Sequence, residues 1–214
     1  MKRREFSLGT AATLAASGLA LPAHAQKKPE DGAEYITLDK RVPVEAAQGK
    51  VEVIEFFWYS CPHCNAFEPK LEAWIKKIPA DVVVKRVPVA FRDSFVPQQR
   101  LFYTLEALGK LDELHRKVFT TIHAERQPLD KEDQILDWAA KQGLDKAKFQ
   151  ELYNSFSVST KARRATQLMD AFKVQGVPAM GIAGRYYTDG TMAGTMDRAL
   201  QVTDYLIGEA RKSR

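Results

Sequence analysis

Hydrophobic and polar residues follow two different periods along the chain, and the first of them indicates β-structure. Residues 51–58 (VEVIEFFW) and 81–91 (DVVVKRVPVAF) are rich in β-branched and aromatic side chains, as buried strands are. Residues 32–38 alternate enough for a further strand. Between the two longer segments, apolar residues recur at three- and four-residue steps from Phe67 to Ile78, which predicts a helix. A strand, a helix and a strand of these lengths predict a βαβ unit with parallel strands.

The period becomes helical from residue 97 to residue 175. Five amphipathic segments are expected there, with Gly109 and Gly143 as helix ends and Asp130 and Ser159 as caps. About 75 helical residues therefore separate the first strands from the rest of the chain.

Strand composition returns in GVPAMGIAGRYYTDG, residues 176–190, with a hairpin turn expected at Ala183-Gly184. A last amphipathic helix is predicted from Met196 to Arg211. The chain thus has the pattern of an α/β domain whose second half follows a helical insertion.

The first residues carry the pattern of an export signal. Three bases at positions 2–4 precede an uncharged run, and Ala23-His24-Ala25 is the small-x-small pattern that signal peptidase cuts. We therefore predict a signal peptide over residues 1–25 and export to the periplasm. The Arg3-Arg4 pair followed by Phe6 is also typical of a twin-arginine signal, so the Sec and the twin-arginine routes both stay open.

The charge of the chain argues against a nucleic-acid partner. The formal net charge is +5 over 214 residues, and loss of the signal, with three bases and one acid, lowers it by two. Nucleic-acid binding requires a much more basic surface.

Both cysteines lie in SCPHCNAFEP, residues 60–69. A disulfide across so short a loop would restrain the unfolded chain by only about 2 kcal/mol, so chemistry explains the pair better than stability does. Cys64 lies three residues before Phe67, on the inward face of the predicted helix, whereas Cys61 falls at its exposed tip. Unpaired N–H groups and the helix dipole at that tip favour a thiolate, the reactive form in disulfide exchange.

A strand that leads into CPHC, a helical insertion and a late GVPA segment (176–179) together resemble the DsbA family of periplasmic thiol oxidants, within the thioredoxin superfamily. The resemblance implies an α/β, thioredoxin-like fold interrupted by an inserted all-helical domain. The thioredoxin-like domain is then expected over residues 26–94 and 175–214, and the inserted helical domain over residues 95–174.

The resemblance also implies roles for individual residues. Cys61 and Cys64 match the redox pair, and Pro62 and His63 match the dipeptide that tunes it. Pro178 matches the family's substrate-binding cis-proline, and Val177 is the residue before it. Glu55 and Glu68 match two acids that modulate the pair, and Arg86 matches a base more loosely.

The function that the resemblance implies is oxidation of newly exported proteins. A substrate thiolate attacks Cys61, a mixed disulfide forms, and a second substrate thiol resolves it. The implied partners are unfolded exported proteins with free cysteines and a quinone-linked membrane protein that re-oxidises the pair. The protein is expected to act as a monomer, with the Cys61–Cys64 disulfide in place of a cofactor.

Other functions of a CxxC protein stay open. A periplasmic reductase or isomerase runs the same chemistry in another direction, and a peptide-binding chaperone could carry the pair incidentally. Haem attachment requires CxxCH, but Asn65 occupies the last position. Zinc requires about four ligands. Neither a cofactor nor a metal is therefore expected.

Two groups of side chains receive no firm role from the pattern. His115 and His123 are interpreted as core or surface residues of the insertion. Four aromatic residues either line a peptide-binding groove or pack in the core: Trp58, Tyr59, Phe91 and Phe95.

Overall fold

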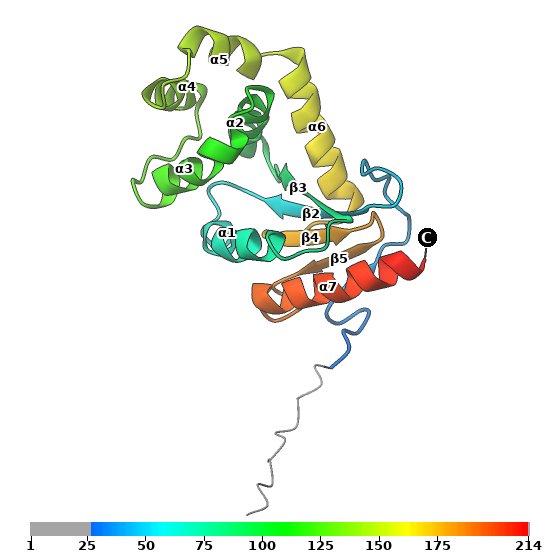
Figure 1. The fold of residues 1–214 in the computed structure, drawn as a ribbon. Coiled ribbons are helices and arrows are strands. Elements are labelled where there is room, and N and C mark those ends of the chain that lie inside the picture. The colour runs from blue at the N-terminus through cyan, green and yellow to red at the C-terminus, as the bar shows by residue number, and fades with distance from the viewer. Residues whose placement is uncertain (1–26, 214) are drawn as a thin grey trace, which may run out of the picture.

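The computed structural model describes residues 27–213, so the predicted signal peptide lies outside the described residues. In the described range one mixed sheet of five strands has the order β1-β5-β4-β2-β3 (Figure 1). The strand expected over residues 32–38 keeps only two residues, because residues 32–34 form a turn. The strands are β1 (Ile36–Thr37), β2 (Val51–Phe57), β3 (Val82–Pro88), β4 (Ala179–Ile182) and β5 (Tyr186–Asp189).

Strand β2 is the centre of the architecture. All seven of its residues are buried, since it pairs in parallel with β3 on one side and antiparallel with β4 on the other. Helix α1 (Pro62–Ile75) connects the parallel strands, which confirms the predicted βαβ unit. The register places Glu55 of β2 opposite Arg86 of β3, so these two side chains leave the sheet side by side.

Strands β4 and β5 form the predicted hairpin at Ala183-Gly184. Both residues have positive φ, 53° and 64°, and Arg185 N closes the turn on the carbonyl oxygen of Ile182, so three residues separate the paired Ile182 and Tyr186. A Cβ on Gly184 would lie 2.0 Å from the carbonyl oxygen of Val42, so glycine is needed here for space as well as for conformation.

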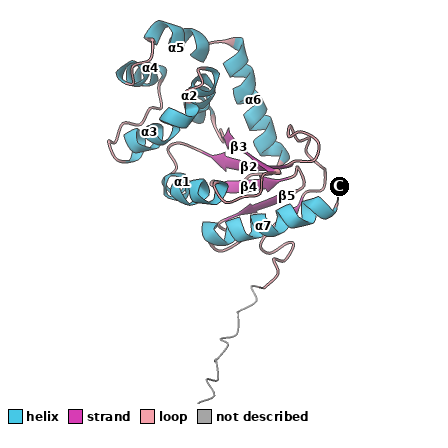
Figure 2. Cartoon of the chain, in the orientation of Figure 1, coloured by secondary structure: helices cyan, strands magenta, loops and turns pink. Residues whose placement is uncertain are grey.

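Helices cover both faces of the sheet (Figure 2). On one face, Phe67 and Leu71 of α1 and Leu206 of α7 (Met196–Lys212) pack with Val51 and Val53 of β2. On the other face, the chain between β3 and β4 forms a group of helices, of which α2 and α6 contact β3. The group follows a 3₁₀ turn (Asp93–Phe95) and consists of α2 (Val96–Ala107), α3 (Leu111–His123), α4 (Glu132–Lys141), α5 (Lys146–Tyr153) and α6 (Phe156–Ala171).

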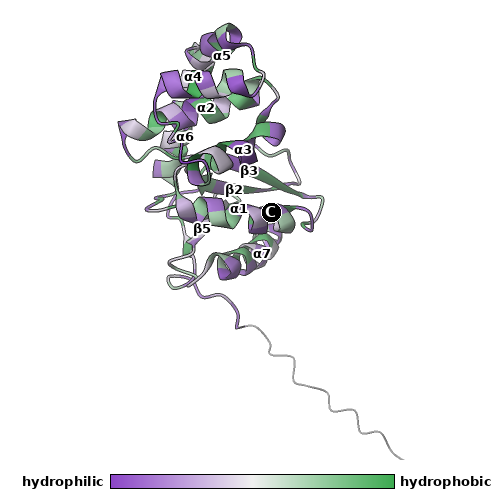
Figure 3. Cartoon of the chain, turned by 90° about the vertical axis from the view of Figure 1, so that its left-hand side faces the viewer, coloured by the Kyte–Doolittle hydropathy of each residue, from purple (hydrophilic) through white to green (hydrophobic). Residues whose placement is uncertain are grey.

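Figure 3 shows hydrophilic and hydrophobic residues mixed along these helices, as the amphipathic pattern predicts. Gly109 and Gly143 follow the ends of α2 and α4 with positive φ, which confirms both predicted helix ends. The expected caps are wrong. Lys131 rather than Asp130 precedes α4. Helix α6 begins at Phe156 and is capped by Ser155, whose Oγ accepts a hydrogen bond from Val158 N, so it starts about one turn before the expected cap Ser159.

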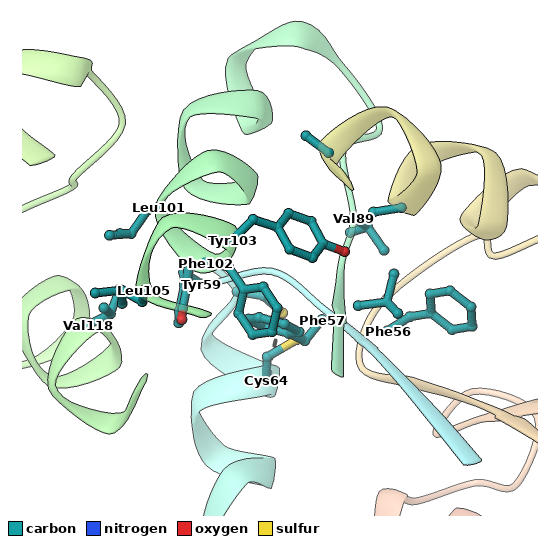
Figure 4. Close-up of a cluster of buried hydrophobic side chains, with 14 of the residues drawn as sticks. Phe56, Phe57, Tyr59, Cys64, Val89, Leu101, Phe102, Tyr103, Leu105 and Val118 are labelled. Carbon is teal, nitrogen blue, oxygen red and sulfur yellow. Dashed lines mark hydrogen bonds between the residues drawn. The ribbon is translucent and has the colours of Figure 1, made fainter. Parts of the chain in front are cut away.

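A single hydrophobic cluster joins the sheet to the helices of the insertion. Figure 4 shows Phe57 of β2 beside Phe102 of α2 and Cys64 of α1, with Leu101 and Leu105 to one side of this group and Phe56 on the other side near Val89. The aromatic rings of Phe57 and Phe102 lie 5.4 Å apart, centroid to centroid. The N-terminal end of α1 therefore packs against the inserted helices.

Candidate active site

Cys61 occupies the N-cap of α1, and its Sγ accepts a hydrogen bond from Cys64 N over 3.4 Å. Pro62 takes the first helical position, where its missing N–H would have had no partner. Strand β2 ends at Phe57, so three residues carry the chain from the sheet to Cys61. The turn is closed by a bond from Cys61 N to the carbonyl oxygen of Trp58.

Both cysteines are free thiols with no disulfide between them. Cys61 is less exposed than its place at the helix tip suggests. Its exposed fraction is 7%, against 0% for Cys64. The carbonyl oxygen of Val177 lies 3.4 Å from Cys61 Sγ and covers it from the side of β4. The Val177–Pro178 peptide is cis, as predicted. While Cys61 carries a proton, its thiol donates to this carbonyl.

The two thiols have opposite acidities. The Cys64 side chain, which donates to Cys61, makes the largest contribution to lowering the pKa of Cys61 to about 6. The N–H groups of Cys64 and His63 act in the same direction, and the charge of the exposed His63 ring contributes least of these. Burial raises the pKa of Cys64. At neutral pH the pair therefore holds its negative charge on Cys61.

Beneath the pair, two buried carboxyl groups share one guanidinium. Arg86 donates to Glu68 from Nε over 3.2 Å and from Nη2 over 3.0 Å, and its Nε lies 3.2 Å from Glu55 Oε2. The side chains of Glu55 and Glu68 are fully buried, and that of Arg86 is 23% exposed. The structure thus brings together the two predicted acids and the loosely matched base.

Burial and the neighbouring Glu68 raise the pKa of Glu55 to about 8. Burial also opposes ionisation of Glu68, yet the hydrogen bonds and charges of His115 and Arg86 hold its pKa below the ordinary value. At neutral pH Glu68 is the carboxylate of the pair, and Glu55 carries a proton.

Three residues of the insertion, none of them foreseen as part of the site, hold the segment that precedes Cys61. Gln98 of α2 pairs its amide with Ser60, through Ser60 N at 3.2 Å and Ser60 Oγ at 2.7 Å. His115 Nδ1 lies 2.9 Å from the hydroxyl of Tyr59, and His123 Nε2 lies 2.8 Å from its carbonyl oxygen. His115 is a core residue, as expected, and both histidines in addition contact the segment before Cys61, which the pattern did not predict. Their spacing of about two turns on one helix was the available signal.

The four aromatic residues divide between core and surface. Tyr59 and Phe95 are buried, whereas Phe91 is exposed and Trp58 is half-buried. Trp58 stacks on Phe95 at 3.8 Å between ring centroids. A cavity of about 700 Å³ instead lies along the cis-proline segment, and its lining residues include His63, Val177, Pro178, Tyr187 and Met192.

Residues 27–213 contain no group of three or more His, Cys, Asp or Glu side chains arranged to hold a metal ion. Within the same range, no helix has the length and apolar character needed to cross a membrane.

The comparisons with known proteins agree with this site. The family profile described as "DSBA-like thioredoxin domain" matches residues 85–201. The chain is 46% identical over 203 residues to the thiol:disulfide interchange protein DsbA of Bordetella parapertussis, covering 94% of this chain and 95% of that protein. The corresponding protein of Pseudomonas aeruginosa PAO1 is 41% identical over 180 residues, covering 84% and 85%.

Solved structures give the same result. The crystal structure of Pseudomonas aeruginosa DsbA superposes with a TM-score of 0.80 at 41% identity and covers 85% of this chain and 94% of that chain. Oxidoreductase DsbA from Xylella fastidiosa superposes equally well at 28% identity and covers 86% and 99%. The fold, the capped CxxC thiol and the adjoining cis-proline define a thiol:disulfide oxidoreductase of the thioredoxin superfamily. Within that class, the chain belongs to the DsbA family, as its sequence predicts.

Proposed function

We propose that this protein donates the Cys61–Cys64 disulfide to newly exported proteins in the periplasm. The observation that carries the proposal is the asymmetry of the pair: Cys61 is an acidic thiol at a helix N-terminus, and Cys64 is shielded behind it. A stabilised Cys61 thiolate stabilises the reduced protein, so the disulfide tends to accept electrons.

The proposed cycle uses only sulfur chemistry. A substrate thiolate attacks Cys61 Sγ, a new S–S bond forms to the substrate, and the electron pair of the broken Cys61–Cys64 bond passes to Cys64. The second substrate thiolate then attacks the substrate sulfur of the mixed disulfide, and Cys61 leaves as a thiolate. The substrate is oxidised by two electrons, and the protein pair is reduced by two.

Glu55 fits the role of proton donor and acceptor for Cys64 in this cycle. Cys64 leaves in a fully buried place where a thiolate is costly, and the negative charge of an ionised Glu55 would raise its pKa further. A neutral Glu55 can instead supply the proton that Cys64 needs, and it recovers the proton when the pair is re-oxidised. Glu68 and Arg86 modulate the pair through their charge balance with Glu55.

Val177 and Pro178 fit the role of the substrate-binding edge. In the disulfide form Cys61 has no S–H to donate, so the Val177 carbonyl becomes available to a backbone N–H of an extended substrate. The cavity of about 700 Å³ along this segment gives the substrate chain room beside His63.

The proposal extends to partners and organisation. The substrates are unfolded exported proteins with free cysteines, and a quinone-linked membrane protein re-oxidises the pair. The protein acts as a monomer after removal of residues 1–25. Residues 26–94 and 175–214 form the thioredoxin-like domain, and residues 95–174 form the inserted helical domain.

One observation favours a second candidate, a periplasmic reductase or isomerase. The pKa of Cys61, about 6, lies nearer to the value of about 7 in thioredoxin than to the value of about 3.5 known for DsbA. Redox equilibration with glutathione separates the two. A strong oxidant has a potential near −120 mV, an isomerase about −180 mV and thioredoxin about −270 mV. A potential at or below that of the isomerase would overturn the oxidant proposal.

A further inference from the structure

The two buried carboxyl groups are held unequally, and the difference comes from the insertion. Glu68 accepts two hydrogen bonds from Arg86 and lies 3.1 Å from His115 Nε2. Neither oxygen of Glu55 accepts a hydrogen bond from any residue between 27 and 213, although Glu55 is ion-paired with Arg86. One guanidinium cannot balance two buried carboxylates, so one carboxyl group must keep its proton.

The hydrogen bonds around His115 have a fixed direction. An ionised Glu68 can only accept, so His115 Nε2 carries the hydrogen and donates it. With Nε2 protonated in the neutral ring, Nδ1 has a free electron pair and accepts from the hydroxyl of Tyr59. Burial keeps the ring neutral by lowering the pKa of His115. Four further charged residues line the cavity beside the ring: Glu72 and Arg116, which lie 3.9 Å from each other at closest approach, and Lys76 and Asp112.

From this geometry we infer that His115, a residue of the inserted helices, is a positioning residue for the redox pair: it keeps Glu68 as the ionised carboxyl group and so leaves Glu55 as the proton-bearing one. The inference deepens the proposed function and rests on the role given there to Glu55. It assigns to α3 control over where the buried negative charge lies.

The position of that charge matters because the two carboxyl groups are not equivalent toward the thiols. Ionised Glu55 is the carboxylate whose charge acts on Cys64. Without the His115 bond, Glu68 loses one of three donors, and the shared proton redistributes so that Glu55 becomes partly ionised. A hydrogen bond to a charged group shifts such an equilibrium by roughly ten- to hundredfold. The negative charge that moves from Glu68 to Glu55 lies at the carboxyl group that acts on the pair, so it disfavours the Cys61 thiolate and makes the protein a weaker oxidant.

A cavity of about 200 Å³ lies beside the network and is lined by Arg86 and His115 together with Glu72 and Arg116. Its volume admits water next to Arg86 and His115.

The test compares His115→Leu, which removes both polar contacts, with His115→Gln, whose amide N–H can replace the Nε2 donor toward Glu68. We expect His115→Leu to raise the pKa of Cys61 and to shift the glutathione equilibrium several-fold toward the oxidised protein, and His115→Gln to restore most of the shift. Thr121→Val is the matched control, since it removes a buried polar contact from the same helix, that to Trp138. It should lower the unfolding midpoint without moving the equilibrium.

The decisive measurement repeats His115→Leu in a Glu55→Gln background, where position 55 cannot ionise. There the redox shift should vanish. A shift of equal size in both backgrounds would overturn the inference, because His115 would then act through Tyr59 or through stability. If His115→Leu does not fold, His115→Asn takes its place, as its shorter amide can face Tyr59 but not Glu68. The shifts between variants test His115, whereas the wild-type potential alone tests the proposed function.

Discussion

At the scale of single residues, the site depends on which atom holds a proton. Cys61 caps the helix with its own sulfur, and its thiolate is stabilised chiefly by a partner thiol three residues away. The CxxC spacing made this pair predictable from sequence. The contacts of Gln98, His115 and His123 were not predictable, because they join segments 38 to 64 residues apart and depend on how α2 and α3 pack on the sheet.

The acidity of Cys61 can be apportioned by substitution. Since the Cys64 side chain contributes most and the His63 charge least, Cys64→Ala should raise the pKa of Cys61 by more than His63→Ala does. Titration of the thiolate absorbance in each variant checks the order. A larger rise in His63→Ala would show that the imidazole, rather than the partner thiol, controls the nucleophile.

Glu55 should destabilise the folded protein at neutral pH. Its folded pKa is raised to about 8 from an unfolded value of ~4.3, so its stability contribution is full below ~4.3 and is lost as pH rises through 8. Glu55→Gln cannot ionise in either state and should therefore be more stable at pH 7, by up to ~3.7 kcal/mol. Urea melts between pH 4 and pH 8 measure the difference. A gain that does not grow with pH would contradict the buried neutral acid.

At the scale of elements, the hydrophobic pattern located every long helix and strand but not all of their ends. The strand before Thr37 is cut short by a turn that its alternation did not reveal. The first turn of α6 was not predicted from the sequence, because its first apolar residue, Phe156, is 80% exposed and does not follow the inward pattern. Helix ends marked by glycine were found, since positive φ restricts the residue type more strongly than a cap does.

The β4–β5 turn gives a prediction with a built-in control. Gly184→Ala combines a positive φ with a Cβ 2.0 Å from the Val42 carbonyl and should destabilise the protein by about 2 kcal/mol or more. Gly208→Ala, inside α7 with open space around it, should stabilise by about 0.5–1 kcal/mol. Thermal melts of the two variants test this prediction. Equal changes in melting temperature would mean that the turn tolerates a side chain at position 184.

At the scale of the whole molecule, the redox state should change stability in a pH-dependent way. The disulfide restrains the unfolded chain by about 2 kcal/mol. The folded pKa of Cys61, about 6, is depressed below an unfolded ~8.5, so the thiolate's contribution is full above ~8.5 and is lost as pH falls through 6. At pH 7 it amounts to about 1.4 kcal/mol, and the two terms balance near pH ~7.5.

Urea melts of the oxidised and the reduced protein check this balance. The oxidised form should have the higher midpoint at pH 6 and the reduced form at pH 8.5. A reduced form that is already more stable at pH 6 would mean a more acidic Cys61 and a stronger oxidant.

The place of β2 between β3 and β4 has a consequence for how the molecule comes into being. A chain that emerges N-terminus first, from a ribosome or from a membrane channel, delivers β2, α1 and β3 early, but the other neighbour of β2 consists of residues 179–182. Until that segment arrives, one edge of the central strand is bare and Val177 cannot lie over Cys61. The newborn chain therefore passes through an interval in which β2 lacks its β4 neighbour and Cys61 lacks the Val177 carbonyl beside it.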